Sequence, residues 1–342
     1  MTKTLNDPVT IGGITLRNRL IMAPLQQYKG TSEAFATEHH RNHYGRRAKH
    51  VGLVILESTA VSPNGRLWAN DIGIYTDRHM ETLRKVTDAV HAHDTPVFIQ
   101  LSHGGRKSSP EVTTTLVAPS AIAFDDQYGM PQELSAEGIH NIIQEYRMAA
   151  RRSVEAGFDG IELHAAHGFL IHQFLSPLSN KRTDAYGGSS EKRARFLQEV
   201  LSAVREEVGR DYPVIVRISA TDYSEGGLIP EEWARMLKPL ESGLDAIHVS
   251  SGGIIPVQPS DVYTAYQLPH AAAIRQHFKI PVIAVGKIYT RSLADRILED
   301  GLADVIAIGR PLLEDPDYAE GLLNVRETAG NAGEKERGDS GR

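Results

Sequence analysis

The segment PVIVRIS, residues 213–219, decides the fold of this chain. It is almost continuously apolar and β-branched, as expected for a parallel strand that is covered on both faces. Seven similar runs, each followed by a polar loop and a helical pattern, are RLIMAPL (19–25), VGLVILE (51–57), PVFIQLS (96–102), GIELHAA (160–166), AIHVSSG (246–252), PVIAVGK (281–287) and DVIAIGR (304–310). Eight strand–helix units are the number that closes a single (β/α)8 barrel of the TIM type.

Amphipathic stretches separate these strands. The clearest begins at Ser135, has apolar residues at helical spacing and ends at Gly157. Residues 197–208, 230–240 and 292–299 show similar patterns. A doubly wound open sheet is the alternative, but no GxGxxG motif follows the first strand, so the Rossmann signature is absent. We predict an α/β barrel over residues 1–328 and a polar tail over 329–342.

The composition excludes several classes of protein. The chain has 342 residues, with 37 Lys and Arg against 43 Asp and Glu, and its net charge of −6 argues against nucleic-acid binding. It contains no cysteine, which excludes disulfides, thiol nucleophiles, thiolate zinc sites and cysteine-bound iron–sulfur clusters. No stretch approaches the ~20 apolar residues that span a bilayer, and the first residues lack a signal-peptide core. We therefore expect a cytoplasmic protein without membrane or nucleic-acid partners.

Polar residues at the carboxyl ends of the strands mark the expected site, since barrels place their chemistry there. Arg217 stands among valines and isoleucines, so it must pair with a buried carboxylate, Glu57 or Glu162, or face an anionic ligand. His164 and His167 leave one strand three residues apart. They fit a metal site, ordinary loop contacts, or two imidazole donors that converge on one substrate oxygen.

Glycines and an arginine follow the last two strands. Gly309 and Arg310 end the eighth strand, and Gly286 ends the seventh. Backbone N–H groups and an arginine at this place form the usual phosphate site of such barrels. The pattern indicates a phosphorylated ligand.

The run HAAHGFLIHQFLSPLSNKRTDAYGGSSEKRARF, residues 164–196, closely resembles the signature of the old yellow enzyme family of FMN-dependent oxidoreductases. RNRLIMAPLQQY, VGLVILESTAVSPNGR, IQLSHGGRK, VRIS and IGR follow the family order, so the resemblance covers essentially the whole chain. Within the family, the sequence most resembles the short bacterial NADPH dehydrogenase branch, the thermophilic-like ene-reductases. Two-domain relatives carry a cysteine-bound cluster, which this chain cannot hold.

The resemblance implies specific roles for residues of this sequence. FMN would lie at the C-terminal face of the strands, held by Ala23, Pro24, Leu25, Gln26, Ala60, Gln100, Arg217, Gly252, Gly286, Gly309 and Arg310. The catalytic residues would be His164, His167 and Tyr28, and the substrate would contact these together with Phe169 and Arg337. No metal is implied. NADPH or NADH would reduce the flavin at N5, which would then reduce a small electron-poor molecule: an α,β-unsaturated carbonyl, a quinone or a nitro compound.

Two positions depart from the family pattern. Phe169 stands where the family usually has the tyrosine that protonates the substrate α-carbon, so the proton must come from solvent, from Tyr28, or not in the usual way. Gln26 stands where this branch often has a cysteine, although its amide can still donate to the flavin C4 oxygen. The alternatives to an ordinary ene-reductase are an isomerase or oxidase-like variant and a flavin-binding sensor with weak turnover.

The polar tail has two interpretations. In this branch an arginine near the C-terminus enters the neighbouring subunit's active site, and Arg337 falls at the matching place. This resemblance implies a homodimer or homotetramer. A frayed terminus is the alternative.

Overall fold

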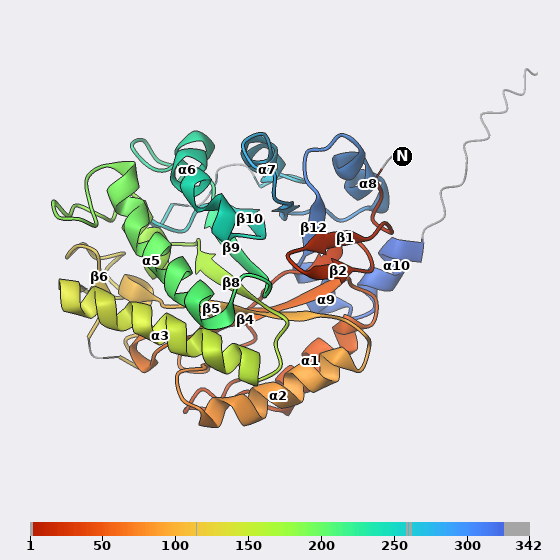
Figure 1. Cartoon of the computed structure of the whole chain (residues 1–342), viewed down its shortest axis with the longest axis horizontal. Coiled ribbons are helices and arrows are strands. Elements are labelled where there is room, and N and C mark those ends of the chain that lie inside the picture. The colour runs from red at the N-terminus through yellow and green to blue at the C-terminus, as the bar shows by residue number, and fades with distance from the viewer. Residues whose placement is uncertain (1–2, 114, 258, 260–261, 325–342) are drawn as a thin grey trace, which may run out of the picture.

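The computed structural model describes residues 3–113, 115–257, 259 and 262–324, and their centre is a closed barrel of eight parallel strands (Figure 1). Around the barrel, in chain order, the strands are β3 (Leu20–Met22), β4 (Leu53–Ala60), β5 (Val97–Ser102), β8 (Gly160–Ala165), β9 (Val214–Ser219), β10 (Ala246–Ser250), β11 (Val282–Ala284) and β12 (Val305–Ile308). β12 pairs with β3 and closes the barrel. The predicted α/β (β/α)8 barrel is confirmed, and each strand falls on one of the eight predicted runs, although β4 continues to Ala60, three residues beyond the end of its run.

Helices cover the outside of the barrel. They are α1 (Glu38–Ala48), α2 (Arg78–His91), α3 (Ala136–Glu155), α4 (Leu170–Leu175), α5 (Ser190–Val208), α6 (Pro230–Leu237), α7 (Leu268–Arg275), α8 (Arg291–Glu299), α9 (Arg310–Glu314) and α10 (Tyr318–Asn324), with short 3-10 turns η1 (Pro63–Gly65), η2 (Gly105–Lys107) and η3 (Lys238–Gly243). The Ser135 hydroxyl caps α3 by accepting from the Gly138 N–H at 3.0 Å. α5 begins earlier than predicted because Ser189 caps it. The predicted helix 230–240 ends at Leu237 and continues as η3.

A hairpin that was not predicted from the sequence closes the end of the barrel at which the strands begin, the amino-terminal end. β1 (Val9–Ile11) pairs with β2 (Ile14–Leu16). Ile11 and Leu16 are fully buried in a cluster with barrel residues that include Phe98 and Ile215. Each such side chain stabilises the fold by about 1.5–3 kcal/mol. Because the hairpin plugs the amino-terminal end, the carboxyl-terminal end is the open one.

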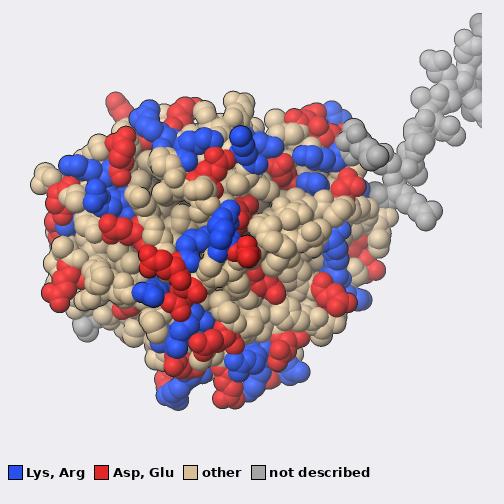
Figure 2. Space-filling model, viewed as in Figure 1, with Lys and Arg blue, Asp and Glu red and all other residues tan. Residues whose placement is uncertain are grey.

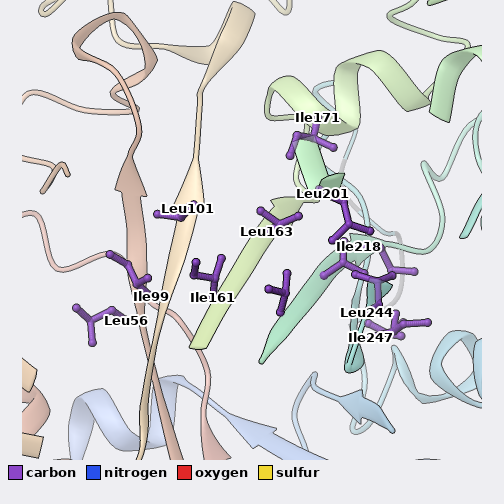
Figure 3. Close-up of a cluster of buried hydrophobic side chains, with 14 of the residues drawn as sticks. Leu56, Ile99, Leu101, Ile161, Leu163, Ile171, Leu201, Ile218, Leu244 and Ile247 are labelled. Atoms are coloured by element: carbon purple, nitrogen blue, oxygen red, sulfur yellow. The ribbon is translucent and has the colours of Figure 1, made fainter. Parts of the chain in front are cut away.

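The larger part of the core lies between the strands and the helices. Figure 3 shows leucine and isoleucine side chains in this layer, among them Leu56 on β4, Leu163 on β8 and Ile218 on β9. Outside it, acidic and basic side chains are interspersed on the face seen in Figure 2, in keeping with the small net charge. Within the described residues, no helix is both long and apolar enough to cross a membrane.

Two short strands lie outside the barrel. β6 (Val117–Ala118) and β7 (Gln132–Glu133) pair as a small parallel sheet in the long connection after β5. The predicted tail over 329–342, with Arg337, lies outside the described residues.

Candidate active site

Three adjoining cavities open at the carboxyl ends of the barrel strands. The first, of about 380 Å³, is lined by Pro24, Leu25, Gln26, Ser58, Leu67, Trp68, Gln100, His164, His167, Phe169 and Arg217. The second, of about 150 Å³, shares Leu25 and Arg217 with it and extends to Gly286, Gly309 and Arg310. The third, of about 410 Å³, shares His167 and Phe169 with the first and Arg310 with the second. The three cavities adjoin through these shared residues, and together they are called the cleft below.

The imidazoles of His164 and His167 face each other in the first cavity. His164 Nε2 lies 3.3 Å from His167 Nδ1. The Ala166 N–H donates to His164 Nδ1 at 3.3 Å, so the proton of this ring is on Nε2. His167 Nε2 lies 2.8 Å from the Ser250 hydroxyl. When that hydroxyl donates, the His167 proton is on Nδ1, and an oxygen atom bound beside the pair can then accept from both N–H groups in place of the direct contact between the two rings.

Both imidazoles are neutral. Burial and the Arg217 guanidinium hold the pKa of His164 and of His167 well below the usual histidine value. Neutral rings donate hydrogen bonds without carrying a charge into the cleft. Within the described residues, no three His, Asp or Glu side chains are arranged to hold a metal ion.

The turn that carries His167 is fixed from several sides. His167 has a φ of +55°, and its N–H donates to the Ser219 hydroxyl at 2.9 Å. The following Gly168 has a φ of +76°, and a Cβ there would lie 2.0 Å from the Gly253 carbonyl oxygen. Only glycine allows the β8 and β10 loops to meet this closely. Lys107 Nζ ties the same loops by donating to the carbonyls of His167 at 2.8 Å and Gly253 at 3.0 Å.

Arg217 points into the cleft as a buried cation. Its side chain is 8% exposed, and its Nε has no hydrogen-bond partner among the described residues. Glu162 instead accepts from Gln100 Nε2 at 2.7 Å and contacts His248 Nδ1 at 2.7 Å. Glu57 accepts from the Tyr44 hydroxyl at 2.9 Å. The ion pair that the sequence left open is therefore not formed in the described part of the chain, and Arg217 remains available to an anionic ligand.

Gln26 is bound to a buried carboxylate. Its Nε2 donates to Asp71 Oδ1 at 2.5 Å, and Asp71 Oδ2 accepts from the N–H groups of Leu67 and Trp68 at 2.7 and 2.9 Å. Burial raises the pKa of Asp71 to about 7. Tyr28 is 48% exposed and lies with its ring against Trp68, 5.0 Å between centroids, at the edge of the cleft.

The remaining predicted residues lie at several places around the cleft. Ala23, Gly286, Gly309 and Arg310 meet in the second cavity, and Gly252 lines the third. Ala60 is buried at the end of β4, and its N–H donates to the Ile72 carbonyl at 3.0 Å. Phe169 packs edge-on against His164, 4.8 Å between ring centroids.

Several residues of the cleft were not predicted from the sequence. Trp68 and Ser58 line the first cavity. Ser250 and Lys107 hold His167. The signal for Ser250 is its place at the carboxyl end of a predicted strand. Lys107 follows a predicted strand within the segment IQLSHGGRK.

Comparisons with known proteins agree with this geometry. The model of the NADH:flavin oxidoreductase / NADH oxidase family matches residues 4–328. An NADPH dehydrogenase of Bacillus subtilis (strain 168) is 45% identical over 93% of this chain and 94% of its own. The structure of an old yellow enzyme homologue from Zymomonas mobilis has a TM-score of 0.81 and 31% identity, over 94% of this chain and 92% of that one. A 2-naphthoyl-CoA reductase has a TM-score of 0.89 and 27% identity over 94% of this chain, which spans 52% of that longer chain. This chain therefore belongs to the NADH:flavin oxidoreductase / NADH oxidase family, the old yellow enzyme family of FMN-dependent oxidoreductases.

Proposed function

We propose that this protein uses NADPH or NADH to reduce electron-poor small molecules, above all α,β-unsaturated carbonyl compounds, and also quinones or nitro compounds. The observation that carries the proposal is the pair of facing, neutral imidazoles of His164 and His167 beside the buried Arg217 cation. Such a pair binds one oxygen atom of a neutral substrate, and the cation favours negative charge next to it.

The cleft fits FMN. A buried guanidinium whose Nε has no hydrogen-bond partner among the described residues favours an anionic or strongly polar ligand, and Arg217 lines both of the first two cavities. Gly309, Arg310 and Gly286 would hold the phosphate. The flavin ring would contact Ala23, Pro24, Leu25, Gln26, Gln100 and Arg217, with Ala60 and Gly252 behind it. Bound FMN supplies a centre that accepts hydride from the nicotinamide and passes it on.

The histidines prepare the substrate for hydride addition. Two N–H donors on the carbonyl oxygen withdraw electron density from the conjugated alkene, so its β-carbon becomes electrophilic. They also stabilise the enolate charge that develops on this oxygen. Removing one such donor costs on the order of 2.7–4 kcal/mol in other enzymes.

A second candidate activity follows from one position. Phe169 lies against His164, where its ring cannot donate a proton. If protonation of the α-carbon is slow, the bound enolate returns its hydride, and the enzyme acts as an isomerase or works with quinones, nitro compounds or oxygen.

An anaerobic stopped-flow experiment tests the proposal. Wild type and Phe169→Tyr are reduced with NADPH and reoxidised with cyclohexenone. We expect reduction of the yellow flavin, followed by saturated ketone as the product. Fast flavin reduction with sluggish enone turnover that tyrosine restores would favour the second activity. A protein that NADPH does not reduce would be a flavin-binding protein without this chemistry.

A further inference from the structure

A lysine stands beside the phenylalanine that cannot donate a proton. Lys107 ends η2, directly after β5, and its Nζ lies 5.2 Å from the centroid of the Phe169 ring and 4.3 Å from that of Phe124. An ammonium group has three N–H bonds. Two of them are used, because Nζ donates to the carbonyls of His167 and Gly253. The third has no acceptor among the described residues.

The ammonium group lies in the wall of the third cavity, next to the Phe169 ring that this cavity shares with the first. Lys107 lines the third cavity together with His167 and Phe169, which also line the first. The third cavity is about 410 Å³, enough for several water molecules. A substrate atom that reaches past Phe169 toward Nζ would meet the free N–H bond, and a proton lost there can be replaced from water in the third cavity.

We propose that Lys107 is the acid that protonates the substrate carbon next to the carbonyl group. The inference rests on the proposed function. Hydride addition to the β-carbon leaves an enolate whose oxygen is held by His164 and His167. One Nζ–H bond of Lys107 then breaks, its proton forms the new C–H bond at the α-carbon, and the electron pair stays on nitrogen. Water in the third cavity returns a proton to the neutral amine.

The surroundings of Lys107 suit an acid that acts near neutral pH. Burial and the neighbouring Arg106 lower its pKa to about 8, against the opposing effect of Asp125. The other titratable groups that face this region are His164, His167, Tyr266 and Arg310. The two histidines are neutral, so they do not add positive charge. The lysine is thus charged at neutral pH but gives up its proton more readily than a surface lysine.

The other expected source is less well placed. Tyr28 is not among the lining residues of the three cavities, and it lies against Trp68 with about half of its surface exposed. The ring nitrogens of His164 and His167 that face the cavity are needed for the substrate oxygen. Lys107 therefore supplies an N–H bond that the site does not otherwise use.

Two substitutions separate proton donation from positioning. Lys107→Arg keeps a positive charge and donors for the two carbonyls, but a guanidinium does not deprotonate in a protein. Lys107→Met removes both functions. Each variant is reduced with NADPH and reoxidised in single turnovers with cyclohexenone or with benzoquinone. The quinone is the internal control, because it receives hydride and proton on oxygen.

We expect both variants to lose at least tenfold in the enone step, since general acids contribute about 10²–10⁴-fold. In Lys107→Arg, which keeps donors for both carbonyls, the quinone step should change less than twofold, and adding Phe169→Tyr to Lys107→Arg should restore the enone step. The wild-type enone rate should fall above pH 8, and this dependence should vanish in Lys107→Arg. NMR of lysine-labelled FMN-bound protein, with Lys107→Arg to assign the signal, should give a pKa near 8.

Two results would overturn the assignment. If Lys107→Arg reduces the enone as fast as wild type does, only the charge or the positioning by Lys107 matters. Equal losses in the enone and quinone steps of Lys107→Arg would lead to the same conclusion. Failure of the proposed function is distinct from either result: wild type itself would then be reoxidised by quinone but not by cyclohexenone, which removes both proposals together.

Discussion

His164 on β8 and Arg217 on β9 are register partners across two neighbouring parallel strands. Partners in register point to the same side of a sheet, so the two strands alone bring the imidazole and the guanidinium into one cavity. Burial, with Arg217 as the next cause, keeps the pKa of His164 low. The barrel register therefore determines both the position and the charge of the His164 imidazole, which is proposed to donate a hydrogen bond to the substrate oxygen.

Replacing Arg217 should affect stability and cofactor binding in opposite directions. In the protein without FMN, Arg217→Met removes a buried charge that has no ion pair within residues 3–113, 115–257, 259 and 262–324, so the free energy of unfolding should rise by about 1 kcal/mol or more. The dissociation constant for FMN should rise at least about tenfold, since the anionic or polar ligand loses its cation. Urea unfolding and fluorescence titration with FMN measure the two effects. Unchanged FMN affinity in Arg217→Met would contradict the placement of the flavin beside this residue.

Each histidine of the facing pair should be essential for enone reduction. His164→Ala or His167→Ala should lower kcat for cyclohexenone by roughly 10²–10³-fold, as expected when one donor to a developing oxyanion is lost. Ser250→Ala is the matched control: it keeps both rings and removes only the hydroxyl that can fix the His167 tautomer, so its loss should be smaller. The contrary finding would be a Ser250→Ala variant as impaired as either histidine variant.

Much of the fold follows from pattern alone. The eight strands are recognisable because parallel strands buried on both faces are continuous apolar runs. Arg217 and the two histidines could be placed because polar residues at the ends of such runs are conspicuous. The hairpin Val9–Leu16 was missed because its two strands have three residues each, too few for a periodic signal.

The contacts between loops could not be predicted. The hydrogen bond of Gln26 to Asp71 spans 45 residues, and that of Lys107 to the His167 carbonyl spans 60. Such pairs depend on how long loops fold over the barrel mouth, which no local pattern determines. Asp71 has no recognisable strand around it, and only its three hydrogen bonds and its burial show its importance.

Asp71 should make the protein less stable as the pH rises. Burial raises its pKa in the folded state from 3.8 to about 7, so the folded state binds the proton more tightly than the unfolded chain. Between about pH 4 and 7 the free energy of unfolding should fall with increasing pH, by at most about 1.4 kcal/mol per unit from this group, and level off above pH 7. Asp71→Asn should remove this contribution in urea unfolding measured at pH 4.5–7.5.

The control for Asp71 is Asp77, an exposed aspartate whose pKa is shifted in the opposite direction. Hydrogen bonding to Arg152 lowers the pKa of Asp77, which therefore titrates below this range. Asp77→Asn should leave the slope between pH 4.5 and 7 unchanged. Glu57, whose pKa burial raises to about 8, contributes to the slope of every variant. An Asp71→Asn slope equal to that of wild type would refute the raised pKa.

Gly168→Ala should destabilise the turn at His167 by more than the positive φ of residue 168 alone would. The new Cβ would lie 2.0 Å from the Gly253 carbonyl oxygen, so the β8 and β10 loops must separate.

Gly188→Ala is the matched control, because Gly188 also has a positive φ, +88°, but no atom within 4 Å of the added Cβ. The control should lose about 1–2 kcal/mol from the left-handed backbone alone, and Gly168→Ala about 1–3 kcal/mol more from the clash. Only Gly168→Ala should also lose enone turnover, because Lys107 can no longer bridge both carbonyls. Equal losses of stability and full activity in both variants would show that the contact between the loops does not hold His167.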